Sequence, residues 1–230
     1  MINEELWGIL PNEIIEKIYS FLRNKDVISL ALTSSRNRRI LKESYNLYGL
    51  VQLNEKDYKI FIKNYPLRLF KIDLSQTSEI TDTGLKHLKD VHTINLESCT
   101  QITDAGLKYL KDVHSIDLEG CTQITDAGLK HLRGVRVINL NNCYRISDEG
   151  LKNLKGILNI SLKNCGKITN EGLKNLENVR FILLWRCNKI TDTGLIHLKS
   201  LQSGIIAGCR KITEIGENFL KEKGVTLIFV

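Results

Sequence analysis

The sequence contains no apolar run long enough to cross a lipid bilayer, and only 2 of its 230 residues are proline. Four glutamates interrupt its first 20 residues, which therefore lack the basic stretch and the uninterrupted apolar run of a signal peptide. No signal peptide is expected. Neither a GxxxxGKS/T loop nor a GxGxxG loop occurs. We therefore expect a soluble protein of the cytoplasm or nucleus (the host cytoplasm if it is viral) that makes no membrane contact.

The composition supports a folded chain with unevenly distributed charge. Hydrophobic residues make up 42%, enough for a sizeable core, which argues against bulk disorder. Residues 71–136 carry 8 basic and 10 acidic side chains, whereas residues 137–230 carry 14 and 8. The basic excess in the last part either favours an acidic partner or provides a solvated, lysine-rich surface.

The six cysteines are spaced evenly, 22 residues apart, at Cys99, Cys121, Cys143, Cys165, Cys187 and Cys209. Disulfide frameworks and zinc sites have uneven or CxxC-like spacings, so equal spacing indicates a repeated structural unit. Units with the same frame begin at Val91, Val113, Val135, Ile157 and Val179, with a degenerate unit from Leu69 and a last one from Leu201.

Each unit predicts a short strand followed by a short helix. Ile94 and Leu96 alternate with polar residues, which is typical of a strand with one buried face. Thr103 is a predicted N-cap, and Asp104 lies in the first turn, where the helix dipole favours it. One unit cannot bury its apolar face alone, so we expect the units to stack, with recurrent glycines that allow close approach of adjacent turns.

The frame LxxLxLxxC-xxITDxGL, which recurs over residues 69–221, resembles the cysteine-containing subclass of leucine-rich repeats. The resemblance implies an α/β solenoid with a parallel concave sheet and short convex helices. The units here are shorter than is usual for that subclass. Residues 225–230, VTLIFV, are expected to add a final strand to the sheet.

Residues 10–40 have a different pattern, in which Pro11 suits a helix entry and apolar residues follow at helical spacing. This segment begins LPNE and resembles the F-box, although Ser34, Ser35 and Asn37 stand where that family usually has a cysteine and a tryptophan. We predict a small all-α F-box-like segment over residues 1–47, a junction and N-terminal cap over 48–68, and the repeat solenoid over 69–230.

The F-box resemblance implies that the N-terminal helices dock onto the Skp-type adaptor of a cullin–RING ubiquitin ligase. The implied contact residues are Leu10, Pro11, Ile14, Ile15, Ile18, Leu22 and Val27. The alternative is that these helices only cap the solenoid. In that case the chain would be a leucine-rich-repeat interaction module with no link to a ubiquitin ligase.

No residue set predicts catalysis, a metal site or a cofactor. The cysteines occupy a repeat position that we expect to be buried, where burial raises the pKa of a thiol and leaves it inert. His87, His131 and His197 share a repeat position with Tyr109 and Phe219, which is typical of a partly exposed helix position rather than of converging ligands. Nucleic acid is not expected as a partner, because no DNA- or RNA-binding motif accompanies the basic second half.

The outward positions of the predicted strands change along the chain from acidic to basic or apolar. One such column runs Ser75, Glu97, Glu119, Asn141, Lys163, Trp185 and Ala207. We predict a binding site for an acidic or phosphorylated segment of a target protein, formed by Lys163, Phe181, Leu183, Trp185, Arg186 and Lys189. The alternative is that the chain's own C-terminal residues, or a second copy of the chain, cover this apolar strand.

Overall fold

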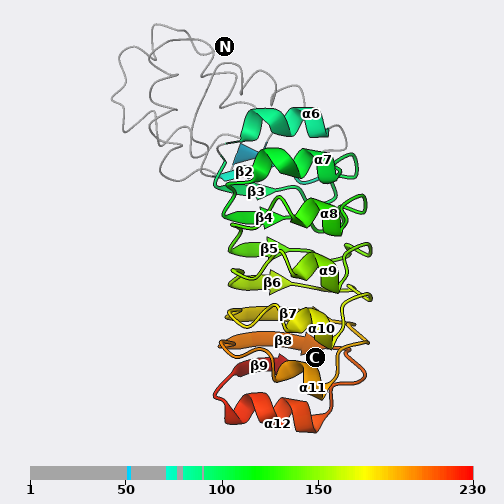
Figure 1. The fold of residues 1–230 in the computed structure, drawn as a ribbon, viewed down its shortest axis with the longest axis vertical. Helices are drawn as coiled ribbons and strands as arrows, with labels where there is room; N and C mark the ends of the chain where they lie inside the picture. The colour runs from blue at the N-terminus through cyan, green and yellow to red at the C-terminus, as the bar shows by residue number, and fades with distance from the viewer. Residues whose placement is uncertain (1–50, 53–70, 77–79, 90, 230) are drawn as a thin grey trace, which may run out of the picture.

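The computed structural model describes residues 51–52, 71–76, 80–89 and 91–229. Within these residues the strands form one parallel sheet, in which each strand lies beside its neighbour in the sequence. The strands are β1 (Val51–Gln52), β2 (Lys71–Asp73), β3 (Thr93–Asn95), β4 (Ser115–Asp117), β5 (Val137–Asn139), β6 (Asn159–Ser161), β7 (Phe181–Trp185), β8 (Ser203–Ala207) and β9 (Thr226–Phe229). Figure 1 shows them stacked along one side of the molecule, with the helices stacked along the other.

A short helix follows each of the strands β2 to β8. The α-helices are α6 (Asp82–Leu85), α7 (Asp104–Leu107), α8 (Asp126–Leu129), α9 (Asp148–Leu151), α10 (Asn170–Leu173), α11 (Asp192–Leu195) and α12 (Glu214–Glu222), and the 3-10 turns η1 (Lys86–Leu88) and η2 (Lys108–Leu110) extend the first two. This alternation confirms the predicted repeat solenoid.

The sheet register equals the repeat length. Ile94 pairs with Ile116 and Ile116 pairs with Ile138, so that equivalent residues of successive repeats lie side by side. The predicted final strand is also confirmed, because β9 pairs with β8 in parallel. The residues of β9 therefore extend the sheet at its edge and do not fold across its outward face.

The core repeats the same buried positions in each unit. In the unit of β3, the side chains of Ile94, Leu96, Cys99, Ile102 and Leu107 are all at most 1% exposed. Ile94 comes from the strand, Leu96 directly follows it, and the helix supplies Leu107. No single unit encloses these side chains, so their burial depends on the units above and below.

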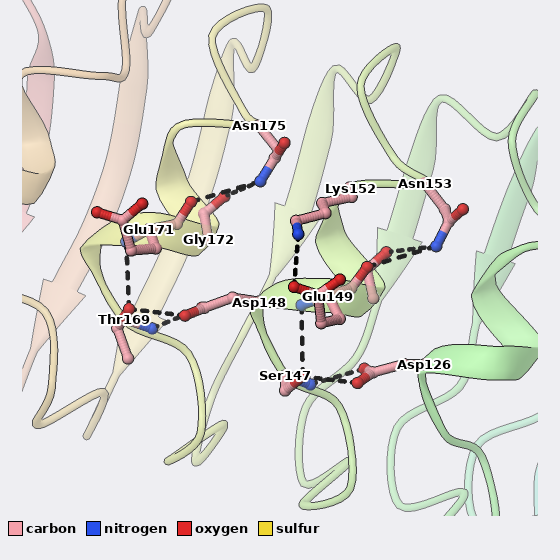
Figure 2. Close-up of polar contacts among 11 residues, drawn as sticks. Asp126, Ser147, Asp148, Glu149, Lys152, Asn153, Thr169, Glu171, Gly172 and Asn175 are labelled. Atoms are coloured by element: carbon pink, nitrogen blue, oxygen red, sulfur yellow. Dashed lines mark hydrogen bonds and ion pairs between the residues drawn. The ribbon is translucent and has the colours of Figure 1, made fainter.

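An acidic residue at the start of most of the helices links neighbouring repeats. The Asp126 carboxylate accepts hydrogen bonds from the backbone N–H and the hydroxyl of Ser147 in the next repeat, at 2.8 and 2.6 Å (Figure 2). The same hydroxyl accepts from the N–H of Glu149, at 3.3 Å, and so caps helix α9. The predicted N-cap is thus confirmed, and it also receives support from the preceding repeat. Equivalent pairs join Asp82 to Thr103, Asp104 to Thr125, Asp148 to Thr169 and Asp192 to Thr213.

The recurrent glycine lies against this acidic residue. A Cβ atom built on Gly150 would collide with the Asp126 carboxylate and press against Leu129. Gly106, Gly128 and Gly172 have the same surroundings. The predicted close approach of adjacent turns is therefore confirmed, and its cause is the carboxylate that crosses to the next repeat.

A left-handed residue ends each strand segment. This position has a φ between 55° and 70° in seven successive repeats, at Gln76, Ser98, Gly120, Asn142, Asn164, Arg186 and Gly208. Left-handed backbone is costly for residues with a Cβ, and asparagine and glycine tolerate it best. The turn reverses the chain away from the sheet and places the following cysteine in the core.

The six cysteines are free thiols and all are buried, as predicted. Each donates a hydrogen bond to a backbone carbonyl of the preceding repeat, as Cys121 does to Leu96 at 3.0 Å. Burial raises the pKa of Cys121 and of Cys165 to about 12. The last two thiols form a coupled pair, in which the hydrogen bond between them raises the pKa of Cys187 and lowers that of Cys209.

Candidate functional site

The strand face is the surface formed by the outward side chains of β2 to β8 and by the left-handed turns that follow these strands. A groove of about 400 Å³ crosses this face from β3 to β7. Polar side chains such as Asn95, Asp117 and Asn139 line most of it, and Phe181 closes one end. The groove lies on the side of the solenoid that the repeat pattern predicted as concave.

The end of the strand face near β2 to β4 is acidic. Asp73, Glu97, Asp117 and Glu119 lie on three adjacent strands or the turns after them. Burial, together with the nearby charges of Asp117 and Glu119, raises the pKa of Glu97 above its ordinary value of 4.5. Burial likewise raises the pKa of Asp117, even though two hydrogen bonds oppose the shift.

Among the described residues, the side-chain hydrogen-bond partners of Asp117 and Glu119 are neutral amides rather than cations. Asn139 donates to Asp117 at 3.0 Å and to Glu119 at 3.1 Å, and Asn141 donates to Glu119 at 3.1 Å. Asn142 adds a further bond to Glu119 at 3.2 Å. In the described part of the chain no ion pair involves any of the four carboxylates. Amides satisfy the hydrogen bonding of the oxygens but leave the negative charge uncompensated.

The end near β7 and β8 is apolar with a cationic margin. Phe181, Leu183 and Trp185 are half-buried and alternate with the buried Ile182 and Leu184, so the predicted outward orientation is confirmed. Ile205 of β8 pairs with Leu183 and continues the apolar surface. Lys163 places its ammonium group 5.0 Å from the centre of the Trp185 ring, a cation–π contact.

The structure brings five of the six predicted target-binding residues together. Arg186 follows Trp185 in the left-handed turn, and a Cβ built on Gly208 would lie 3.3 Å from its Cγ, so its side chain extends over the turn of the next repeat. Lys189 is exposed in the loop before α11. Lys189 is the predicted residue that lies apart, because no interaction between described residues connects it with Lys163 or Trp185.

The predicted adaptor-binding residues lie outside the described residues. This applies to Leu10, Pro11, Ile14, Ile15, Ile18, Leu22 and Val27 alike. Their role stays a prediction, as do the domain boundaries at residues 47 and 68.

Sequence reasoning missed the amide cluster formed by Asn139, Asn141 and Asn142. Asn141 is only 8% exposed, and its Oδ1 accepts from the backbone N–H of Lys163 at 2.8 Å. The repeat alignment placed Asn139 and Asn141 in the outward columns, but their bonds to Glu119 join residues 20 and 22 positions apart. The available signal was asparagine in the columns that carry Asp117 and Glu119 one repeat earlier.

The histidine positions have ordinary environments. His131 is exposed and His197 is half-buried, in agreement with a partly exposed helix position. His92 and His114 stack with their ring centres 4.6 Å apart. The residues that the structure describes include no group of three or more potential ligands suited to a metal ion. None of the helices in this part is long and apolar enough to cross a membrane.

Comparison with solved structures identifies the fold. The chain matches TLR13 in its complex with ssRNA13, with a TM-score of 0.53 and 15% identity over 68% of this chain and 24% of that one. It matches Toll in the Drosophila Toll–Spätzle complex, with a TM-score of 0.52 and 13% identity over 69% and 22%. It also matches the internalin InlF of Listeria monocytogenes, with a TM-score of 0.50 and 19% identity over 76% and 50%. The chain thus spans at most half the length of these three proteins, and the likeness concerns the repeat fold alone.

Comparison with protein families adds the N-terminal segment. Residues 7–48 match the F-box domain, and residues 87–111 match a leucine-rich repeat. No curated protein matches the chain. The chain therefore combines an F-box domain with leucine-rich repeats.

Proposed function

We propose that the chain is a substrate-recognition subunit of an SCF-type cullin–RING ubiquitin ligase. In this role the F-box docks onto a Skp-type adaptor, and the strand face of the solenoid holds a target protein. The ligase chemistry belongs to the partners, so the chain needs no catalytic residue of its own. The observation that carries the proposal is the match of residues 7–48 to the F-box, followed in the same chain by the repeat solenoid.

Adaptor docking is proposed for the apolar residues Leu10, Pro11, Ile14, Ile15, Ile18, Leu22 and Val27. Their spacing predicts helices with an apolar surface, which remains unfavourably exposed unless a partner covers it.

Target capture is proposed for Lys163, Phe181, Leu183, Trp185, Arg186 and Lys189. Half-buried aromatic side chains next to cations are typical of interface hot spots. The ring of Trp185 and the ammonium of Lys163 are already in contact, so little side-chain entropy is lost when a partner covers them. An acidic or phosphorylated segment fits the charge of this end of the strand face.

The second candidate is an interaction module whose N-terminal helices only cap the solenoid. It is favoured by the complete burial of Ile72 and Leu74 in the first described repeat, because the end of a repeat stack needs a cap to bury its apolar residues. The two candidates differ in one property, namely whether the surface of Leu10, Ile14 and Leu22 is free to bind another protein.

The test is a pull-down of the full chain with a purified Skp-type adaptor. The variant Ile14→Asp/Leu22→Asp places charges on the proposed docking surface, and Lys163→Glu/Lys189→Glu serves as a matched double variant on the strand face. Circular dichroism and thermal unfolding confirm that each variant folds. The proposal predicts that the adaptor binds the wild type and the strand-face variant but not the first variant. If folded wild-type chain fails to retain the adaptor, the N-terminal helices are a cap and the ligase role is wrong.

A further inference from the structure

The two ends of the strand face carry different chemistry, and a groove runs between them. Asn95 and Asp117 line the groove beside the acidic end, and Phe181 of β7 lines its other end. The proposed target contacts use only the second of these ends. At the acidic end, Asp117 accepts a hydrogen bond from the backbone N–H of Glu119 at 2.8 Å, and neutral amides donate to Asp117 and Glu119 without balancing their charge.

Like charges lie close together at the acidic end. Burial and the nearby carboxylates of Asp117, Glu119 and Asp73 raise the pKa of Glu97. Among the described residues, none donates a hydrogen bond to the Glu97 carboxylate. A cation placed among these groups would gain Coulomb energy from several carboxylates at once.

We propose that the strand face binds an extended segment of the target in which a lysine or arginine precedes or follows an apolar residue at a fixed distance. The apolar side chain packs on Phe181, Leu183 and Trp185, and the cationic side chain reaches the carboxylates of Glu97, Asp117 and Glu119. This inference rests on the proposed use of the strand face for target capture, and it adds a basic residue, bound at the acidic end, to the acidic or phosphorylated segment proposed for the Lys163 end.

The spacing follows from the sheet. Neighbouring strands are about 4.8 Å apart, so β4 lies about 14 Å from β7, and β3 lies about 19 Å from it. An extended chain advances about 3.3 Å per residue. A segment that crosses the strands along the groove therefore places its cation about four to six residues from its apolar anchor. A compact or helical segment would be shorter over the same number of residues and would not span the two ends.

Charge complementarity selects this occupant over others. Nucleic acid and anionic lipid would meet Asp117 in the groove and the carboxylates of Glu97 and Glu119 beside it. A wholly acidic segment would match the margin of Lys163 and Arg186 but would be repelled along the groove. A second copy of the chain would have to insert an extended segment, whereas its own edge strand β9 is paired within the sheet.

The test is a selection of random 12-residue peptides, displayed on phage, against the immobilised full chain. Enrichment of peptides with lysine or arginine four to six positions from phenylalanine, tryptophan or leucine supports the proposal. Peptides enriched without a basic residue, with a basic residue at random spacing, or no enrichment at all would overturn it.

Variants then locate the cation on the surface. Binding of a selected synthetic peptide, followed by fluorescence anisotropy, should weaken roughly tenfold in Glu97→Gln, as expected for loss of one charge-assisted contact. Glu177→Gln, on the helix side, is the matched control and should leave the affinity unchanged. In Glu97→Lys, a peptide with glutamate in place of its basic residue should bind better than the original peptide. Equal affinities for the two peptides would contradict the assignment.

The adaptor pull-down on the same preparation separates this inference from the ligase proposal. If the adaptor binds but the selected peptides lack the spaced basic residue, only the inference about the target fails. If the peptides show the pattern but the adaptor does not bind, the groove assignment stands and the ligase proposal fails.

Discussion

The fold places Glu97 among other carboxylates, which disfavours the charged form of its side chain. Its outward position on the strand face is fixed by the alternation with Ile94 and Leu96, which are buried. The same alternation puts Asp73 and Asp117 on either side of its strand. The repeat therefore gathers like charges wherever acidic residues occupy equivalent positions, and the pKa of Glu97 is raised as a result.

Because folding raises the pKa of Glu97, the folded state binds its proton more tightly than the unfolded state does. The resulting stabilisation is complete below the ordinary value of 4.5 and is lost as the pH rises through the raised value. At pH 7 the carboxylate is charged in both states and the repulsion is fully present. We predict that Glu97→Gln raises the free energy of unfolding at pH 7 by roughly 0.5 kcal/mol, allowing for solvent screening.

Urea unfolding at pH 4 and at pH 7 measures this effect. The gain should be absent at pH 4, where glutamate is already largely protonated. Glu177→Gln is the control, since Glu177 is exposed on the helix side. A gain of equal size at both pH values would show that repulsion is not its cause.

Each of the helices α7 to α12 begins with a carboxylate except α10, which begins with Asn170. Its amide takes the place of the carboxylate that elsewhere supports the N-cap of the following helix. Its Nδ2 donates to the Thr191 hydroxyl at 2.8 Å, and that hydroxyl is 2.9 Å from the Thr193 hydroxyl. As a consequence Thr191 does not cap helix α11 with its side chain. In the other repeats, the carboxylate accepts from the hydroxyl and leaves its oxygen free to cap.

We predict that Asn170→Asp restores the missing cap and stabilises the fold by about 1 kcal/mol, the usual value of an N-cap bond. Thermal unfolding at pH 7 provides the measurement. Asn218→Asp in α12 introduces the same charge at an exposed position and should have a smaller effect. If Asn170→Asp is neutral or destabilising, the carboxylate is not what orients the threonine hydroxyl.

At the scale of elements, the link between one helix start and the next is the feature that turns separate units into a solenoid. Most units offer a carboxylate to the following repeat and an N-cap hydroxyl to the preceding one, as Asp126 and Ser147 illustrate (Figure 2). The glycine in the helix leaves space for that carboxylate. Asp126, Ser147 and Gly150 therefore form one contact that joins two neighbouring repeats.

A double-mutant cycle tests the contact between Asp126 and Gly150. Gly150→Ala should cost about 1–3 kcal/mol, the usual range for overpacking, because its Cβ collides with Asp126. Asp126→Ala should cost about 2 kcal/mol through lost charge-assisted hydrogen bonds. The double variant should be less destabilised than the sum of the two by at least about 1 kcal/mol, because removing the carboxylate removes the collision.

The control for the cycle is Gly166→Ala, where a Cβ would meet nothing within 4 Å. This variant should be close to neutral in the same denaturant unfolding experiment. Strict additivity of Gly150→Ala and Asp126→Ala would contradict the proposed contact.

The sequence predicted the strands, the helix starts and the buried columns, because these follow from periodicity within a unit of 22 residues. It did not predict the bond from Asp126 to Ser147 or those from Asn139 and Asn141 to Glu119. Such bonds join residues 20 to 22 positions apart, and they depend on how one unit is placed on the next. The altered pKa of Cys209 was missed for the same reason, since it depends on contact with Cys187.

The sequence predicted which residues form the apolar end of the candidate site, but it did not predict the groove. The apolar strand of Phe181 and Trp185 and the neighbouring Lys163 were identified from the outward columns. The groove that runs from Asp117 to Phe181 was not, because a hollow depends on the size and packing of many side chains. The acidic columns were visible in the sequence, but the burial that makes them unfavourable required the structure.

At the scale of the whole molecule, we propose two independent binding functions for one chain. The F-box at residues 7–48 would bind the ligase adaptor, and the strand face from β3 to β8 would bind the target. Because the two sites use different residues, each should tolerate damage to the other. A chain with this property would connect a target to a ligase.

The measurement that tests this claim most directly is an isothermal titration of the purified full chain with a purified Skp-type adaptor. The account predicts a 1:1 complex for the wild type, with the same affinity for Trp185→Ala and Lys163→Glu, since these residues lie on the strand face. It also predicts loss of binding in Ile14→Asp/Leu22→Asp. Absence of binding by folded wild-type chain, or dependence of the affinity on Trp185, would contradict the account.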